Sequence, residues 1–270
     1  MITDEEFQRI VSFLKRRYGI DMHEKKVIIN GRLENYLKHG GWSNYTEYMD
    51  DVENDSSGEL EKALVNFLTT NHTYFMREFQ HFDFFKQVVL PWIKKKEGRT
   101  MDMRVWCGAS STGEEPYMIA MVIKDFLGLE SRQWDARILA TDISTQALSQ
   151  AVAGVYEEEH LKSVPESWKR HFFKKMSNGN YAATQELKDQ VIFRKFNLMD
   201  PFPFKRKMHA VFLRNVMIYF DEPTRREVIQ KVYDLLEPGG YFFIGMTETL
   251  DRGSTPFQLI QPSIFRKQEG

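Results

Sequence analysis

The sequence is poor in cysteine and has no long apolar run. Its single cysteine, Cys107, excludes a disulfide within the chain, and its place in a predicted strand favours a small buried side chain over a nucleophile. No stretch reaches the roughly 20 apolar residues of a membrane-spanning helix, and the opening MITDEEFQRI lacks a basic region followed by an apolar core. We therefore expect a cytoplasmic protein with no direct membrane insertion.

An excess of charge of either sign is also lacking. The chain has 37 basic and 38 acidic residues and a net charge of −1, so nucleic acid is not an expected partner. Its seven histidines lack zinc-ligand spacing, and we predict no metal site. A length of 270 residues with 42% hydrophobic content is ordinary for a globular protein of one large or two modest domains.

One stretch, RVWCGASSTGEEPYMIAMVIKDFLG at 104–128, organises the chain. Its Val and Trp favour a strand over 104–107, and Gly108 ends that strand. Small residues then form a loop as far as Gly113. The Glu-Glu-Pro that follows suits the first turn of a helix, and the last glycine of the stretch suits its end. The sequence therefore predicts a strand, a tight loop and a helix.

In open α/β sheets such a first loop is where a nucleotide-like ligand binds. A dinucleotide site needs G-x-G-x-x-G, whereas this loop offers only Gly108 and Gly113. Glu114 and Glu115 would repel a phosphate, but they suit a ligand with hydroxyls, an amine and a positive sulfur. The loop therefore favours S-adenosylmethionine, although an ordinary surface turn with acidic residues remains an alternative.

A second predicted strand, ARILATDI at 136–143, carries a carboxylate near its end. Asp142 stands about 20–30 residues past the first loop, where an acidic side chain can accept hydrogen bonds from both ribose hydroxyls. The pairing with the first loop favours an adenosine ligand. The alternative is a cap for the next helix, predicted over 144–151.

Residues 1–70 read as a small all-helical domain. Thr3 and Glu6 predict a capping box for a helix that ends at Gly19, and a second helix is predicted over 23–38. From residue 9 to residue 38 there are eight basic and three acidic residues. These residues are either solvated helix faces or a docking surface for an acidic partner.

The segment 69–82, TTNHTYFMREFQHF, interrupts the helical pattern with residues that prefer caps and turns. One interpretation is a hinge whose aromatic residues pack on the next helix. The other is a lip over the ligand site that offers amide, hydroxyl and guanidinium groups. A helix bent by Pro91 is predicted over 78–96.

Strands and helices alternate in the second half, which demands a mainly parallel sheet with right-handed crossovers. A small antiparallel sheet with a turn at Asn178–Gly179 is expected as an insertion. The final two strands are expected to pair antiparallel. The other predicted elements are strands at 191–197, 209–220, 241–245 and 257–266 and a helix at 222–236.

Four segments together resemble the bacterial chemotaxis receptor methyltransferases of the CheR type. They are NHTYFMRE at 71–78, STGEEPY at 111–117, ATDIS at 140–144 and RNVMIYFD at 214–221. The resemblance implies an α/β fold, a Rossmann-like S-adenosylmethionine-dependent methyltransferase with a seven-stranded sheet whose last strand is antiparallel. It divides the chain into a helical receptor-docking domain at 1–70, a linker and helix at 71–96 and a catalytic domain at 97–270, with the β insertion at about 172–190.

The resemblance also implies an activity: transfer of a methyl group from S-adenosylmethionine to glutamate side chains of membrane chemoreceptors, leaving S-adenosylhomocysteine. Arg77 and Tyr219 are the expected catalytic residues. The expected cofactor-binding residues are Asn71, Thr73, Arg77, Glu115, Asp142, Asn197, Leu198, Arg214 and Asn215. The loop at 176–181 is shorter than in family members whose small sheet holds a receptor tail peptide, which puts such tethering in doubt.

The residues agree with this chemistry. A glutamate acceptor is already an anion at neutral pH, so no general base is required, and the sequence offers no His/Asp or Cys/His pair. The implied partners are chemoreceptors, docked mainly by the helical domain. The oligomeric state is not fixed by the sequence, and a monomer is the simplest expectation.

Three other functions compete with this one. A base-amine methyltransferase usually has an Asn/Asp-Pro-Pro-Tyr stretch where this chain has RNVMIY. A dinucleotide oxidoreductase is not supported, because the first loop lacks the third glycine of its motif and is followed by two glutamates. A non-catalytic regulator that senses S-adenosylmethionine and binds receptors or another acidic partner remains the main alternative.

Overall fold

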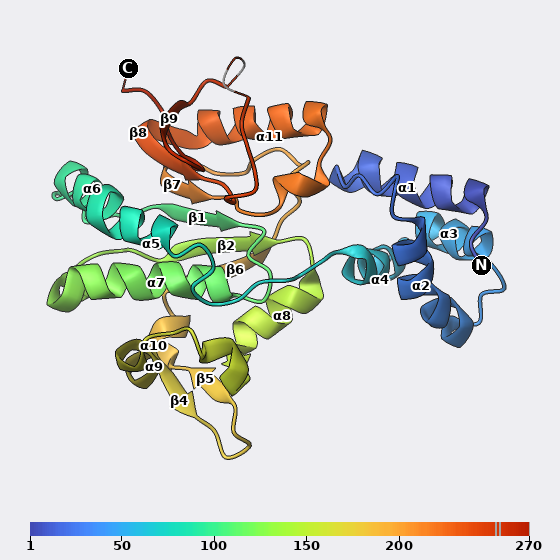
Figure 1. The fold of residues 1–270 in the computed structure, drawn as a ribbon, viewed down its shortest axis with the longest axis horizontal. Helices are drawn as coiled ribbons and strands as arrows, with labels where there is room; N and C mark the ends of the chain where they lie inside the picture. Colours follow the sequence, from blue (N-terminus) through green and yellow to red (C-terminus); the bar gives the residue numbers. More distant parts are fainter. Residues whose placement is uncertain (252, 254, 270) are drawn as a thin grey trace.

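The structure, a computed structural model, describes residues 1–251, 253 and 255–269. Its N-terminal helices form a separate body joined to the rest by an extended segment (Figure 1). Thr3 and Glu6 form the predicted capping box, and Gly19 ends the first helix in the left-handed conformation, at φ 69°. The helices are α1 (Asp4–Tyr18), α2 (Lys26–Gly40), α3 (Tyr45–Asn54) and α4 (Glu59–Leu68). Their buried side chains make one apolar core, which confirms the helical domain.

The larger part of the chain is built on a mixed sheet. Its strands are β1 (Val105–Gly108), β2 (Ile138–Asp142), β6 (Val191–Lys195), β7 (Met208–Phe212), β8 (Leu236–Phe243), β9 (Gln258–Gln261) and β10 (Ile264–Arg266). In the described residues these seven strands have the order β6-β2-β1-β7-β8-β10-β9. The first five are parallel, whereas β10 is antiparallel to both β8 and β9. The predicted sheet with an antiparallel end is confirmed, and its strand order reverses between β1 and β7, where ligands of such sheets bind.

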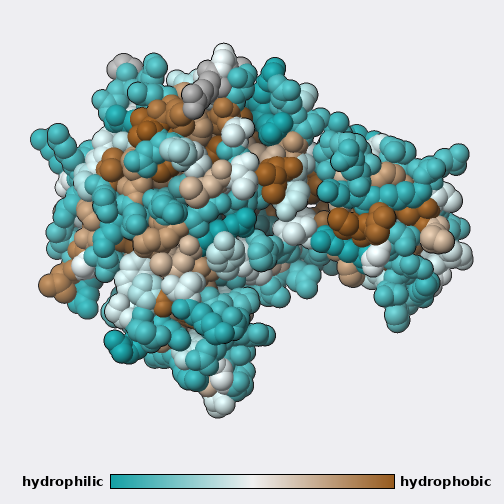
Figure 2. Space-filling model, in the orientation of Figure 1, coloured by the Kyte–Doolittle hydropathy of each residue, from teal (hydrophilic) through white to brown (hydrophobic). Residues whose placement is uncertain are grey.

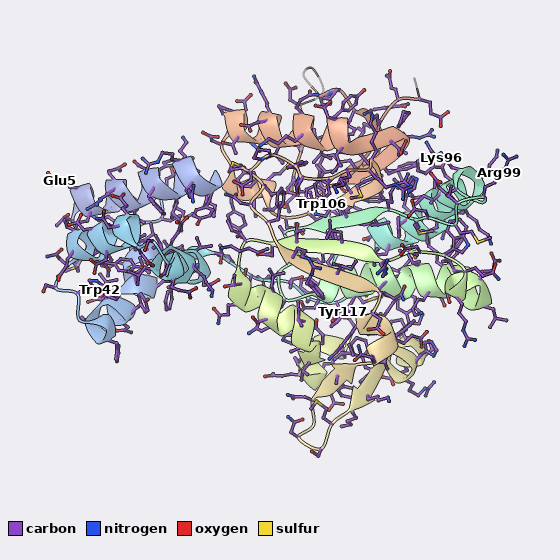
Figure 3. All side chains as sticks on the ribbon, turned by 180° about the vertical axis from the view of Figure 1, so that it is seen from behind. Glu5, Trp42, Lys96, Arg99, Trp106 and Tyr117 are labelled. Carbon is purple, nitrogen blue, oxygen red and sulfur yellow. The ribbon has the colours of Figure 1, made fainter. Side chains whose placement is uncertain are left out.

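Helices cover both faces of the sheet (Figure 1). One face packs against α7 (Glu114–Leu127) and the other against α11 (Glu222–Leu235), while α8 (Thr145–Ala153) runs beside β2 and β6. Trp106 and Tyr117, labelled in Figure 3, belong to the two separate cores on the opposite faces. The central strands β1 and β7 are buried at every residue, so they supply side chains to both cores at once.

The helix before the sheet differs from the prediction. The expected single helix over 78–96 is three pieces: α5 (Gln80–Phe84), a π-helix η1 (Phe85–Val89) and α6 (Leu90–Lys96). Pro91 lies in the first turn of α6 rather than in a helix interior. Because proline has no N–H to donate, the turn before it cannot keep the ordinary hydrogen-bond ladder, and it widens into a π-turn.

The insertion carries its own sheet, as predicted. Its strands are β3 (Val155–Tyr156), β4 (Phe173–Lys175) and β5 (Tyr181–Ala183), in the order β3-β5-β4, with all pairs antiparallel. The turn contains Asn178 and Gly179, and Gly179 has φ 90°. The short helices of this region are η3 (Glu158–Leu161), α9 (Glu166–Phe172) and α10 (Gln185–Lys188).

Three predicted strands have different bounds. The strand expected over 209–220 ends at Phe212, and a 3₁₀ helix, η4 (Met217–Tyr219), follows it. β8 begins at Leu236, so it includes the Pro-Gly-Gly expected to precede it; the pairing with β7 shifts register there, which accommodates a residue without an N–H. The single strand expected over 257–266 is the hairpin β9–β10. A further 3₁₀ helix, η2 (Gly128–Arg132), follows α7.

None of the helices in the described part of the chain is long and apolar enough to cross a membrane. On the face seen in Figure 2, apolar residues gather over the helical domain and over the C-terminal strands.

Candidate active site

A cavity of about 180 Å³ lies at the carboxyl ends of β1, β2 and β7, between the sheet and the helical domain. It is walled by the loop after β1, the end of β2, the segment after β7, the linker 69–77 and the turn between α1 and α2. Its place at the reversal of strand order is the one expected for a ligand site of an open α/β sheet. The predicted site residues among its lining are Asn71, Thr73, Arg77, Glu115, Asp142, Leu198, Arg214, Asn215 and Tyr219.

Asp142, at the end of β2, is held by the first loop. One carboxylate oxygen accepts the N–H of Ser111 at 2.7 Å and the other accepts the N–H of Ser144 at 2.8 Å. Ser144, rather than Asp142, caps α8, because its Oγ accepts the N–H of Ala147 at 3.1 Å. Burial raises the pKa of Asp142, and these N–H groups act against that rise. The carboxylate is thus fixed at the cavity wall with oxygen lone pairs left for a ligand.

The two glutamates that begin α7 have different surroundings. Glu115 lines the cavity, whereas Glu114 is fully buried outside it and accepts a hydrogen bond from the Thr112 hydroxyl at 2.6 Å. Burial raises the pKa of Glu114. The sequence predicts that both glutamates suit the ligand, but only Glu115 lines the ligand site.

Arg214 links three segments behind the cavity. Its guanidinium donates to Glu115 at 2.5 Å, to the Arg77 carbonyl at 2.7 Å and to Glu78 at 3.0 Å. Only 1% of its side chain is exposed, and it lies over the Phe82 ring at 5.2 Å. Burial raises the pKa of Glu78, but the Arg214 charge and hydrogen bonds outweigh that effect and hold the pKa below its ordinary value. The Glu78 carboxylate is therefore ionised and hydrogen-bonded to Arg214, which is the condition for tolerating a charge away from water.

Left-handed backbone conformations are concentrated around the cavity. Five residues other than glycine have φ between 49° and 68° in or beside its walls: Ala109, Ser111 and Asn215 line the cavity, and Met76 and Glu78 flank Arg77. Such conformations each cost about 1–3 kcal/mol for an L-residue and persist where surrounding contacts enforce them. Here Ser111 directs its N–H to Asp142, and Asn215 directs its N–H to Glu248.

Arg77, on the linker, and Tyr219, at the end of η4, both line the cavity. Arg77 is half-buried; its Nη1 donates to the His72 carbonyl at 3.0 Å, and no carboxylate of the described residues pairs with it. Tyr219 is half-buried at the end of η4, and its carbonyl accepts the N–H of Asp21 at 2.8 Å. The guanidinium of Arg77 therefore has donors left for an anion.

The turn between α1 and α2 closes one side of the cavity. Ile20 forms an antiparallel bridge with Phe220, and the Lys15 ammonium pairs with Asp221 at 2.9 Å. This turn and its flanking helices contribute Tyr18, Ile20, Asp21, Met22, Lys25 and Ile28 to the lining, and α4 of the same domain contributes Leu68. No pattern in the sequence of α1 or α2 predicts that this turn reaches the site.

One predicted cofactor residue lies outside the lining. Asn197 donates from Nδ2 to the Arg17 carbonyl at 2.8 Å and accepts the N–H of Met199 at 3.1 Å, so its side chain joins the helical domain to the sheet. Its neighbours Phe196 and Leu198 do line the cavity. A contact of Asn197 with the cofactor stays a prediction.

Two acidic residues were not selected from the sequence. Glu78 belongs to the quoted NHTYFMRE segment, and Glu248 follows β8, where it accepts four backbone N–H groups around Asn215. A polar residue just past a buried strand was the signal that identified Asp142, and the same signal applies to Glu248. Its distance of several residues from the strand end hides it from a motif search.

Buried His81, near Arg214, makes the stability of the folded protein depend on pH. It is 1% exposed, its Nε2 lies 2.7 Å from Ser263 Oγ, and burial, together with the Arg214 charge, lowers its pKa to about 4. The unfolded chain, with a pKa of about 6.5, then binds a proton more readily than the folded chain. This contribution to stability is complete above pH 6.5 and is lost as the pH falls toward 4.

We expect this loss to amount to about 2 kcal/mol between pH 7 and pH 5, since each pKa unit is worth about 1.4 kcal/mol. Urea unfolding of wild type and His81→Gln at both pH values measures it, because the difference between the two proteins cancels the other titrating groups. Equal pH dependence in the two proteins would show that His81 is not buried in its neutral form.

Comparison with known proteins identifies the family. The family model described as "CheR methyltransferase, SAM binding domain" matches residues 71–265, and "CheR methyltransferase, all-alpha domain" matches residues 5–69. The chain belongs to the CheR methyltransferase family. Residues 71–265 therefore form an S-adenosylmethionine-binding domain, as the first loop and Asp142 predicted.

Curated CheR relatives match almost the whole chain. The chemotaxis protein methyltransferase of Borreliella burgdorferi is 37% identical over 98% of this chain and 95% of its own. That of Escherichia coli is 35% identical over 98% of this chain and 91% of its own. The chemotaxis protein methyltransferase 2 of Pseudomonas aeruginosa is 35% identical over 97% and 93%. Both parts of the architecture are thus shared.

The cavity suits the CheR cofactor chemically. Asp142 supplies a buried carboxylate for hydroxyl groups, and the apolar side chains of Ile143, Phe196 and Leu198 line the wall nearby. Ser110 Oγ, in the lining, is buried without a hydrogen-bond partner among the described residues. An unpartnered buried hydroxyl is expected where a ligand completes the hydrogen bonding.

Proposed function

We propose that this protein methylates glutamate side chains of membrane chemoreceptors in the cytoplasm, with S-adenosylmethionine as methyl donor. The observation that carries the proposal is the convergence of Glu115, Asp142 and Arg77 on one cavity in a chain similar to chemotaxis protein methyltransferases. The products would be glutamate methyl esters and S-adenosylhomocysteine, and the reaction would serve chemotactic adaptation.

The proposed binding roles follow the placement of the residues. Asp142 accepts hydrogen bonds from the ribose hydroxyls, and the wall at Leu198, with Asn197 behind it, flanks the adenine. Glu115, Arg214 and Asn215 hold the methionine part. Asn71 and Thr73, on the linker, close over the cofactor from the other side.

The reaction asks for positioning rather than proton transfer. When bound, S-adenosylmethionine supplies an electrophilic methyl group on a positive sulfur. The acceptor glutamate is ionised at neutral pH, so the chain must place its oxygen about 3 Å from that carbon and in line, which is worth several kcal/mol. Arg77 offers a planar, bidentate donor pair for the acceptor carboxylate, and Tyr219, in the same cavity lining, offers a hydroxyl.

The helical domain is proposed as the docking surface for the receptor, but most of its cations already have partners. Lys26 pairs with Asp4, Arg9 with Glu53, and Arg17 with Glu61. The Arg32 guanidinium is not available for docking. It donates to the carbonyls of Leu68 and Thr69 and so fixes the start of the linker. Arg16 and Lys25 have no ion-pair partner among the described residues, and Lys25 lines the cavity.

We expect the double reversal Arg16→Glu with Lys25→Glu to lower receptor methylation about tenfold at low salt, because four units of charge change face an acidic partner. The affinity for S-adenosylhomocysteine should fall by a smaller factor than the methylation rate, and it is measured alongside because Lys25 lines the cavity. The loss should shrink at 0.5 M salt, where the screening length falls below about 5 Å. Methylation rates with receptor-bearing membranes at both salt concentrations measure this.

A matched control is the exposed Lys205, which lies at the opposite end of the strands, in the lining of a separate hollow. Lys205→Glu with Arg206→Glu makes the same change in net charge and should leave methylation unchanged. An equal loss in both pairs would mean that net charge, and not a docking surface, controls the rate.

The deciding assay incubates the full chain with methyl-labelled S-adenosylmethionine and chemoreceptor-bearing membranes, and then measures methanol released by alkali. Release identifies methyl esters. Cofactor binding without release would support the alternative, a non-catalytic regulator that senses S-adenosylmethionine.

A further inference from the structure

A buried carboxylate lies beneath the wall of the cavity that carries Tyr219. Glu248 is 7% exposed and is not part of the cavity lining. One of its oxygens accepts the N–H groups of Met217 at 2.7 Å and Ile218 at 3.3 Å. The other accepts those of Asn215 at 2.8 Å and Gly245 at 2.6 Å.

These N–H groups begin where the sheet ends. Leu213 still donates to the Phe243 carbonyl, and Ile244 still donates to the Ser263 carbonyl. Beyond them, the backbone N–H groups of both chain segments turn to Glu248. A single carboxylate therefore continues the hydrogen bonding of two strands into the loops above them, with charge-assisted bonds stronger than neutral ones.

The segment fixed in this way carries the groups at the cavity. Asn215 has φ 57°, a conformation that its N–H bond to Glu248 helps to enforce. The bonds to Met217 and Ile218 hold the first two residues of η4, and Tyr219 is its third. Gly245 packs so closely on this segment that a Cβ there would lie 2.2 Å from Asn215 Nδ2.

We propose that Glu248 is a positioning residue for methyl transfer: by binding the N–H groups of residues 215, 217 and 218, it fixes the position of the Tyr219 side chain relative to the reacting atoms. Its carboxylate touches neither substrate nor cofactor. The inference rests on the proposed methyl transfer for its kinetic consequence, whereas the fixing of the segment stands on the four hydrogen bonds alone.

A double-mutant cycle tests the kinetic part. Glu248→Gln should lower kcat by at least about tenfold, and KM for S-adenosylmethionine should rise by a smaller factor than kcat falls, because Asn215 is held by Glu248 but Asp142 and Glu115 lie on other elements. In the Tyr219→Phe background, the same substitution should lower kcat by less than about threefold, since neighbours that act as one unit are non-additive. Equal losses in both backgrounds would overturn the proposal.

Amide hydrogen exchange tests the positioning without any substrate. Glu248→Gln should speed exchange in the peptide 213–220 by at least about tenfold, and Glu248→Asp, which keeps the charge but cannot reach all four donors, should give a smaller effect. Unchanged exchange in 213–220 would overturn the proposal. This readout remains valid if the wild-type chain methylates no receptor, so failure of the proposed function and failure of the positioning role are distinguishable.

Glu6 provides a matched control. It is also a buried carboxylate that accepts backbone N–H groups, from Thr3, Tyr45 and Thr46, but it lies in the helical domain. Glu6→Gln should speed exchange near residue 45 and leave both the peptide 213–220 and kcat unchanged. A fall in kcat with Glu6→Gln equal to that with Glu248→Gln would show that general loosening, and not position, explains the effect.

Discussion

Replacing Arg214 with Met should lower the free energy of unfolding by about 3–5 kcal/mol, because it leaves Glu115 and Glu78 as buried carboxylates without a counter-charge. It should also abolish measurable binding of S-adenosylhomocysteine. The Arg214 guanidinium donates to Glu115 of α7, to the Arg77 carbonyl and to Glu78, and so holds α7 and the linker to the end of β7. Chemical denaturation and calorimetric titration measure the two effects.

Arg104 is the matched control for this change. It is likewise nearly buried, at 11% side-chain exposure, and pairs with Glu97, Asp102 and Glu237, at the other end of the sheet. Arg104→Met should cost a similar amount of stability and leave the affinity for S-adenosylhomocysteine unchanged at temperatures where the protein is folded. If both variants lost affinity equally, Arg214 would have no special part in the site.

Replacing Arg77 with Met should lower the rate of methyl transfer about 10²–10³-fold, the usual effect of removing a donor that stabilises or orients a reacting oxyanion. The affinity for S-adenosylhomocysteine should fall much less, because Asp142 and Glu115 remain. Arg77→Lys should recover less than a tenth of the activity, since a single ammonium cannot bind a carboxylate through two parallel N–H donors.

Single-turnover rates with receptor membranes, together with calorimetric affinities, separate the two effects of Arg77. The exposed Arg170 of the insertion is a suitable control, and Arg170→Met should leave the rate unchanged. A loss of affinity in Arg77→Met as large as the loss of rate would assign Arg77 to cofactor binding alone.

Much of the fold follows from local patterns in the sequence. The capping box at Thr3, the glycines that end helices and the apolar strands place most elements within a few residues. The wrong element bounds lie where tertiary contacts, rather than local sequence, decide where a strand begins or ends. Pro238 is tolerated inside β8 because the register shifts beside it, and the segment after Phe212 leaves the sheet because Glu248 takes its N–H groups.

Only the first loop and Asp142 were predicted from strand ends; the other expected site residues were implied by the resemblance to the CheR methyltransferases. Asp142 and Glu115 adjoin strands or their loops, so their position along the chain fixes their position in space. The contribution of the α1–α2 turn depends on how two bodies pack, through Ile20 and Phe220, and no short pattern encodes that. Asn197 shows the converse, since packing against Arg17 occupies a side chain expected at the cofactor.

The most direct test is a calorimetric titration of S-adenosylhomocysteine into the full-length protein and its Asp142→Asn variant. The account predicts binding to wild type, and an affinity roughly 10–150-fold weaker in the variant, the range for losing hydrogen bonds to a charged group. NAD should not bind either protein. Equal affinities of wild type and Asp142→Asn would contradict the claim that Asp142 binds the adenosine part of the cofactor.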